Sequence, residues 1–81
     1  MKKTQTQKVL EVLQYNIRKW LPAWYFVGYR QGINGRVFLS YKAPARLSEI
    51  YRDFDTKIVR KTEITEGARY YSYKLTKKIY E

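Results

Sequence analysis

The sequence contains neither cysteine nor histidine. Without cysteine the chain has no disulfide and no thiolate ligand for a metal. Without histidine it lacks the commonest general base and the commonest zinc ligand. Acidic residues are also scarce, with 7 Asp and Glu against 17 Lys and Arg, so the formal net charge is +10 on 81 residues. Because this excess destabilises the compact state by self-repulsion, a nucleic acid is the first candidate partner and an anionic membrane the second.

Long apolar runs are missing as well. No stretch approaches the ~20 residues of a membrane span, and the N-terminus lacks a signal-peptide pattern, so we expect a cytoplasmic protein without a membrane partner. If the chain is viral, this means the cytoplasm of the host cell. The length predicts a single domain over residues 1–81, with a flexible basic arm at 1–5 and a tail at 76–81.

Features of catalytic sites are absent too. The four glycines, Gly28, Gly32, Gly35 and Gly67, do not form a phosphate-binding loop. Asp53 and Asp55 have a metal-pair spacing, but two carboxylates without further ligands rarely hold Mg²⁺. The sequence therefore predicts that the chain is not an enzyme and binds no cofactor, metal or small-molecule substrate.

The most informative stretch runs from Ser40 to Phe54. Its apolar side chains recur at i, i+4, i+7 and i+11, which predicts an amphipathic helix starting at Ala43 or Pro44. The opposite face mixes small residues with Arg and Lys, which suits a helix that enters a DNA major groove; the alternative is an ordinary solvated surface helix. The residues predicted to contact DNA are Lys42, Ala45, Arg46, Ser48, Glu49 and Arg52.

Two helices are predicted before this stretch. The first runs from Thr6, as N-cap, to about Trp20. Its apolar face is formed by Val9, Val12, Leu13, Ile17 and Trp20, and its outward face includes Lys8, Glu11 and Gln14. A short second helix is predicted over residues 22–28, with Pro22 in its first turn, Gly28 as its stop, and Trp24, Val27 and Phe26 directed into the core.

Two hairpins are also predicted. The pair Asn34-Gly35 indicates a type I′ turn joining residues 30–33 to 36–39, with Arg36 able to reach a phosphate. Residues 57–63 and 69–75 form the second hairpin, whose cations include the predicted DNA contacts Arg60, Lys61 and Arg69. By the period of two, Tyr71, Tyr73 and Leu75 share one of its faces.

This order of elements resembles the winged helix-turn-helix domain over residues 6–75. The most telling segments are Ala45-Arg46-Leu47-Ser48-Glu49-Ile50, Lys57-Ile58-Val59 and Tyr73-Lys74-Leu75, which are similar to small winged-helix proteins of phages, archaeal viruses and other mobile elements. The expected fold class is therefore α+β, with three helices, a C-terminal two-stranded wing and an additional small hairpin between the second and third helices.

The resemblance implies that the chain binds double-stranded DNA, with the third helix in the major groove and the wing on the backbone. We therefore expect a transcriptional regulator of viral or mobile-element origin, acting as a homodimer on a pseudo-palindromic site. The alternative is a small basic interaction or inhibitor module that binds an acidic or nucleic-acid-handling protein. A third hypothesis, single-strand or RNA binding through Tyr70, Tyr71 and Tyr73, requires those rings to be exposed.

Overall fold

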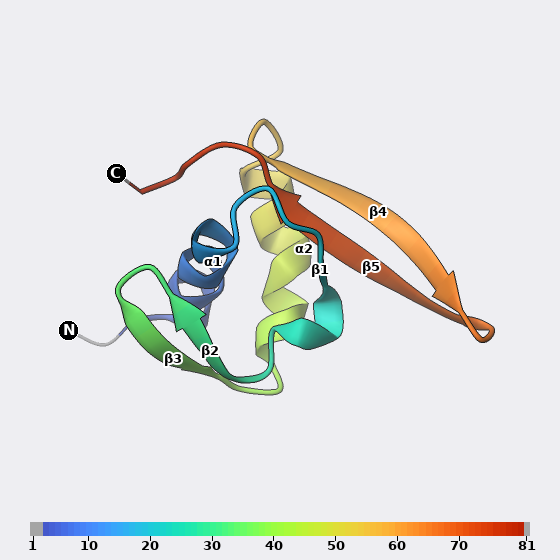
Figure 1. Ribbon diagram of the computed structural model, residues 1–81, viewed down its shortest axis with the longest axis horizontal. Helices are drawn as coiled ribbons and strands as arrows, with labels where there is room; N and C mark the ends of the chain where they lie inside the picture. The colour runs from blue at the N-terminus through green and yellow to red at the C-terminus, as the bar shows by residue number, and fades with distance from the viewer. Residues whose placement is uncertain (1–2, 81) are drawn as a thin grey trace.

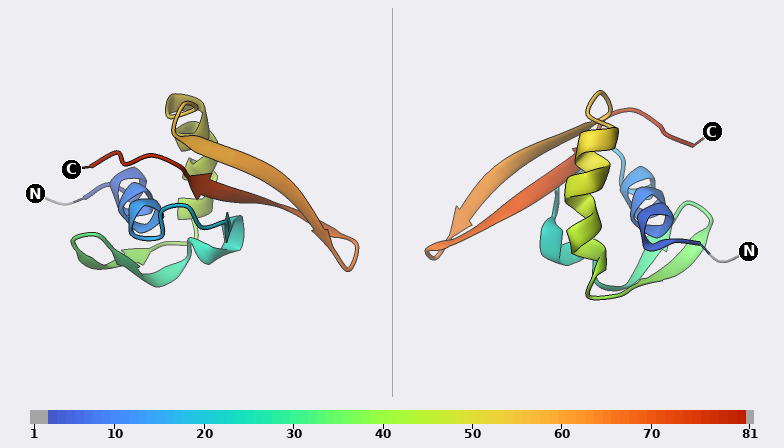
Figure 2. Two further views of the ribbon diagram at one scale, coloured as in Figure 1. Left: turned by 45° about the horizontal axis from the view of Figure 1, so that its top comes forward. Right: turned by 180° about the vertical axis from the view of Figure 1, so that it is seen from behind.

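A computed structural model describes residues 3–80 as two α-helices and five short strands around one core (Figures 1 and 2). Strands β1, β5 and β4 form an antiparallel sheet in the order β1-β5-β4, and β2 pairs with β3 in a separate antiparallel hairpin. The elements in chain order are α1 (Gln5–Tyr15), β1 (Leu21–Pro22), the 3₁₀ turn η1 (Ala23–Tyr25), β2 (Gly28–Gly32), β3 (Gly35–Leu39), α2 (Ala43–Asp53), β4 (Ile58–Thr65) and β5 (Ala68–Leu75).

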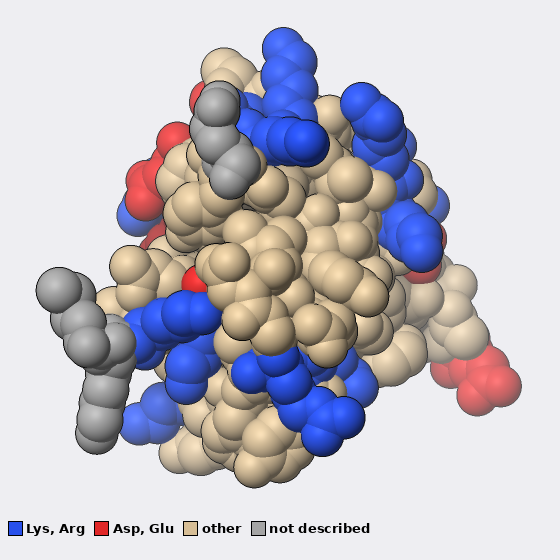
Figure 3. Space-filling model, turned by 60° about the vertical axis from the view of Figure 1, so that its left-hand side comes forward, with Lys and Arg blue, Asp and Glu red and all other residues tan. Residues whose placement is uncertain are grey.

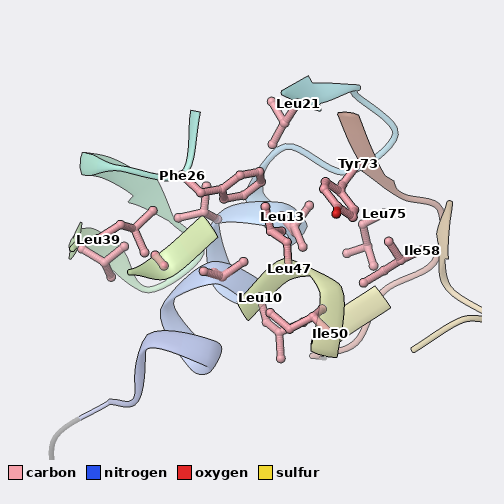
Figure 4. Packing of buried hydrophobic residues seen from close by; sticks show 14 residues of the cluster. Leu10, Leu13, Leu21, Phe26, Leu39, Leu47, Ile50, Ile58, Tyr73 and Leu75 are labelled. Atoms are coloured by element: carbon pink, nitrogen blue, oxygen red, sulfur yellow. The ribbon is translucent and has the colours of Figure 1, made fainter. Parts of the chain in front are cut away.

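The core lies where α1, α2 and the base of the β1-β5-β4 sheet meet (Figure 4). Helix α2 contributes Ala43, Leu47 and Ile50, each at most 1% exposed, which confirms the predicted stripe. Burying side chains the size of Leu47 and Ile50 stabilises the fold by roughly 1.5–3 kcal/mol each. The other buried apolar residues are Val9, Leu10, Val12, Leu13, Leu21, Phe26, Val37, Leu39, Ile58, Tyr73 and Leu75.

Helix α1 is shorter than predicted and begins earlier. Thr4 is the N-cap instead of Thr6, and its side chain and that of Gln7 form a capping box with each other's backbone N–H groups. The helix ends before Arg18, which has a φ of +67° and whose N–H donates to the Leu75 carbonyl at 2.8 Å. Trp20 therefore lies outside the helix and is 37% exposed.

The structure describes most of the two segments predicted as the ends of the chain. Residues 1 and 2 of the predicted arm lie outside the described part of the chain, whereas Thr4 and Gln5 belong to the start of α1. In the tail, the backbone N–H groups of Ile79 and Tyr80 donate to the side chain of Gln14. Residue 81 is likewise outside the described range.

The predicted second helix is wrong. Pro22 has an extended backbone, with φ −68° and ψ 154°, and pairs with Ser72 of β5. Only the three residues of η1 turn helically after it, and of the apolar cluster Phe26 is buried whereas Trp24 is 64% exposed and Val27 37% exposed. Residues 3–80 thus contain two α-helices, so the expected three-helix, winged helix-turn-helix fold is wrong.

The hairpin predicted at Asn34-Gly35 exists, but its turn differs. Gly32 pairs with Gly35, so the two loop residues are Ile33 and Asn34. Gly35 takes a positive φ of +115°, and Asn34 is not among the positive-φ residues described. The loop therefore lies one residue earlier than predicted, and it is not a type I′ turn, because neither Ile33 nor Asn34 has a positive φ.

The C-terminal hairpin is confirmed and is longer than predicted. Strands β4 and β5 pair over eight residues each and extend away from the core (Figure 1). The loop residues Glu66 and Gly67 have φ values of +51° and +81°. Within residues 3–80, no helix combines the length and apolar character needed to cross a membrane.

Candidate nucleic-acid interface

Helix α2 presents small residues to solvent between longer charged ones. All six predicted contact residues of this stretch are exposed: Lys42, Ala45, Arg46, Ser48, Glu49 and Arg52. Ala45, Ser48 and Arg52 follow one another at i, i+3 and i+7, so they share a face. The eleven residues of α2 span about 16 Å, a length that can lie in a DNA major groove.

The charge of this helix is balanced. Arg46 Nη1 lies 3.2 Å from Glu49 Oε1, and Arg52 Nε lies 3.8 Å from Asp53 Oδ1. Residues 42–55 contain three cationic and three acidic side chains and so have no net charge. The net positive charge on this side of the molecule therefore lies in the neighbouring β4–β5 hairpin, where residues 57–75 contain five cationic and two acidic side chains.

A stacked arginine connects α2 to that hairpin. The Arg60 guanidinium carbon lies 4.4 Å from the ring centroid of Tyr51 on α2 and 4.5 Å from that of Tyr71 on β5. The ring of Tyr51 also meets the buried Tyr73 edge-on, with the two centroids 6.3 Å apart. Each exposed cation–π contact stabilises by about 0.5–1 kcal/mol, so this group holds the hairpin at a defined angle to α2.

The strand register divides the hairpin cations between two faces. Arg60 pairs with Tyr73 and Arg69 with Ile64, so Arg60, Arg69 and Tyr71 lie on the face that adjoins α2. Lys61 pairs with Ser72 and lies on the opposite face. The predicted wing contacts therefore do not share one surface: the structure brings Arg60 and Arg69 together and separates Lys61 from them.

On the opposite face, Trp20 attracts the lysines. The Nζ atoms of Lys61 and Lys74 lie 4.5 and 4.7 Å from its ring centroid. Lys61 Nζ also pairs with Glu63 Oε1 at 2.9 Å, and the Tyr70 hydroxyl donates to Glu63 Oε2 at 2.7 Å. The hydrogen bond from Tyr70, followed by that from Lys61, lowers the pKa of Glu63 below its ordinary value.

Arg36 lies elsewhere in the molecule. It is exposed on β3, and the β2–β3 hairpin and the β4–β5 hairpin lie on opposite sides of α2 (Figures 1 and 2). Arg36 therefore does not belong to the surface formed by α2 and the long hairpin. We name that surface the α2–hairpin surface, and it consists of Ala45, Ser48, Arg52, Arg60, Arg69 and Tyr71.

Base stacking on the C-terminal tyrosines requires exposed rings, and of the three only Tyr71 is exposed, at 43%. Tyr73 is only 2% exposed, and the ring of Tyr71 is covered on one side by Arg60. Tyr70 is partly buried and engages Glu63, whose negative charge opposes phosphate. These three rings do not form an accessible row.

Sequence reasoning missed the aromatic residues that position the cations. The sequence pattern places Tyr51 in the helix predicted within residues 40–54 and Tyr71 on a strand face, without identifying a partner for either ring. The positions of Arg60 and Trp20 relative to them depend on strand pairing, which the sequence pattern does not specify. The only available signal was the coincidence of many tyrosines with many cations, since arginine and lysine side chains often lie over aromatic faces.

No pocket and no cluster of three potential metal ligands occurs among residues 3–80. On the side where α1 and the β2–β3 hairpin come forward, lysine and arginine side chains lie around the margin of a largely uncharged centre (Figure 3). Comparisons with models of protein families, with curated proteins and with solved structures find no match.

Proposed function

We propose that the chain binds double-stranded DNA through the α2–hairpin surface. The observation that carries this proposal is the stacking of Arg60 between Tyr51 and Tyr71. It fixes a cationic hairpin beside a helix whose outward residues Ala45 and Ser48 are small. Small side chains permit close approach of the helix to base edges, while hairpin arginines contact phosphates.

The distribution of charge suggests different contributions of α2 and the hairpin to DNA binding. Because residues 42–55 have no net charge, α2 supplies fit and base contacts, and Arg60 and Arg69 supply most of the electrostatic attraction. Arg52, late in α2, contacts a phosphate between them. Binding of this kind releases counterions, so its affinity falls steeply with salt concentration. A regulator of transcription would in addition prefer particular base sequences over random duplex.

The test is the fluorescence anisotropy of a labelled random duplex at several salt concentrations. We expect Arg52→Ala and Arg69→Ala each to weaken binding and to reduce the slope of log K against log salt by about 1. Lys78→Ala, which removes the same charge from the exposed tail, is the matched control and should leave binding by the α2–hairpin surface nearly unchanged. Absence of duplex binding at low salt, or equal effects of all three variants, would refute the proposal.

A second candidate is supported by the balanced charge of α2. A helix with paired Arg46 and Glu49 also suits a protein partner that complements both signs. In that case the α2–hairpin surface binds an acidic protein and the chain acts as an interaction or inhibitor module. This candidate predicts no duplex binding at low salt, the outcome that refutes the first.

A further inference from the structure

The outer face of the β2–β3 hairpin carries aromatic rings that the fold leaves uncovered. Val37 and Leu39 face inward and are buried, at 8% and 0% exposure. The alternate residues therefore face outward, and among them Tyr29 is 65% exposed and Phe38 49% exposed. Because burying these rings would be favourable, their exposure on a paired, ordered hairpin calls for a ligand.

The two rings form one platform with a cation at its edge. Tyr29 and Phe38 are directly paired across the strands, and their ring centroids lie 5.1 Å apart with a tilt of 58°. Arg36 is two residues before Phe38 on the same face, and its guanidinium carbon lies 6.0 Å from the Tyr29 centroid. Gln31, opposite Arg36 in the register, adds a neutral hydrogen-bonding side chain.

The platform is held firmly on the core. Gly32 approaches α1 so closely that a Cβ there would lie 3.2 Å from Glu11 Cβ and 3.3 Å from the Gly35 carbonyl oxygen. Beneath the rings, Arg30 stacks on Tyr25 at 4.3 Å and its Nε donates to the Tyr25 carbonyl at 2.7 Å. The rings are thus held by a hairpin that is fixed on the core, which lowers the entropic cost of ordering the binding surface when a ligand binds.

The stretch of chain that contains the platform carries charge of one sign. Between Glu11 and Glu49 the chain contains six cationic residues and no acidic one: Arg18, Lys19, Arg30, Arg36, Lys42 and Arg46. Tyr41, 79% exposed, follows β3 with Lys42 beside its ring at 5.9 Å. Charge complementarity therefore favours a polyanion over an apolar or basic protein.

We propose that this outer face, defined by Tyr29, Gln31, Arg36 and Phe38, binds single-stranded nucleic acid by stacking unpaired bases on its rings. Every base has a flat π-face that can stack on an aromatic ring, and the phosphate next to that base can pair with the Arg36 guanidinium. The site goes beyond the proposed duplex binding and does not depend on it, because the two surfaces lie on opposite sides of α2 (Figures 1 and 2).

The experiment measures the anisotropy of labelled oligothymidylate and oligouridylate with the native chain, Tyr29→Leu and Phe38→Leu. Leucine keeps apolar bulk but removes the stacking face, so we expect each variant to weaken binding about tenfold. Tyr29→Phe keeps the ring and should bind as the native chain does. Tyr15→Leu, which alters an exposed tyrosine on α1, is the matched control. A preference for one oligonucleotide identifies the ligand as DNA or RNA.

Several outcomes would overturn the inference. They are the absence of binding to both oligonucleotides at low salt, an unchanged affinity in Tyr29→Leu and Phe38→Leu, or an equal loss in Tyr15→Leu. Circular dichroism establishes that each variant is folded. Measuring duplex binding as well separates the two proposals. Tyr29→Leu should bind duplex as the native chain does. Arg69→Ala should bind duplex more weakly, whereas its affinity for oligothymidylate should remain within about twofold of native.

Discussion

At the scale of single residues, Arg60 matters through what surrounds it more than through its charge. It belongs to β4, but its guanidinium contacts one ring from α2 and one from β5. The prediction of Arg60 as a DNA contact rested on its place in a basic strand, and the structure adds a positioning role. A residue with both roles should change stability and binding together when it is replaced.

Replacing Arg60 by methionine tests this double role. Methionine keeps a similar apolar stem but cannot make either cation–π contact, so we expect the free energy of unfolding to fall by about 1 kcal/mol. Urea denaturation measures the change. Arg69→Met removes an arginine from the same hairpin face and should alter stability by no more than about 0.5 kcal/mol. Equal stability of the two variants would show that Arg60 does not join α2 to the hairpin.

At the scale of elements, periodic patterns were predictive and short apolar segments were not. The stripe of α2 recurs over about three turns, so its location and its buried face followed directly from the sequence. Residues 22–28 are fewer than two helical turns, and the apolar run fits a buried helix or a strand entering a sheet equally well. Pairing of Pro22 with β5 decides between them, and a pairing over such sequence distance cannot be read from local pattern.

Helix α1 and the turn of the β2–β3 hairpin also depend on contacts that the local sequence pattern does not specify. Both Thr4 and Thr6 are good N-caps, and the capping box with Gln7 selects Thr4. Glu11, predicted to face outward, is 5% exposed because the β2–β3 hairpin covers it, and it pairs with Lys3 Nζ at 2.9 Å. Likewise, the strand pairing places the loop at Ile33-Asn34, one residue before the predicted position. For the candidate site, sequence identified the exposed α2 residues but not which cations share a face.

The turn of the β4–β5 hairpin offers a prediction at this scale. Glu66 and Gly67 both have the positive φ that a type I′ turn requires, yet glutamate is a poor residue for that conformation. Glu66→Asn should therefore raise the free energy of unfolding by about 0.5–1 kcal/mol, measured by thermal and urea denaturation. Glu66→Gln makes the same charge change without asparagine's preference for positive φ, so it should raise the free energy of unfolding much less. Equal increases in the two variants would assign the effect to charge instead of backbone conformation.

At the scale of the whole molecule, positive charge is distributed unevenly among otherwise similar elements. Helix α2 is balanced by its own acids, residues 12–48 contain no acid, and the long hairpin is basic on both faces. The net charge of +10 therefore belongs to several surfaces. Two of them, on opposite sides of α2, combine cations with accessible contact residues, and we have proposed a different form of nucleic acid for each.

An amide chemical-shift titration of the isotope-labelled chain with a short random duplex would show directly which surface binds DNA. We predict that shift changes concentrate in residues 45–52 of α2 and 60–71 of the long hairpin, with little change at residues 29–38, and that they diminish as salt is raised. Changes concentrated on the β2–β3 hairpin, or no changes at low salt, would contradict this prediction.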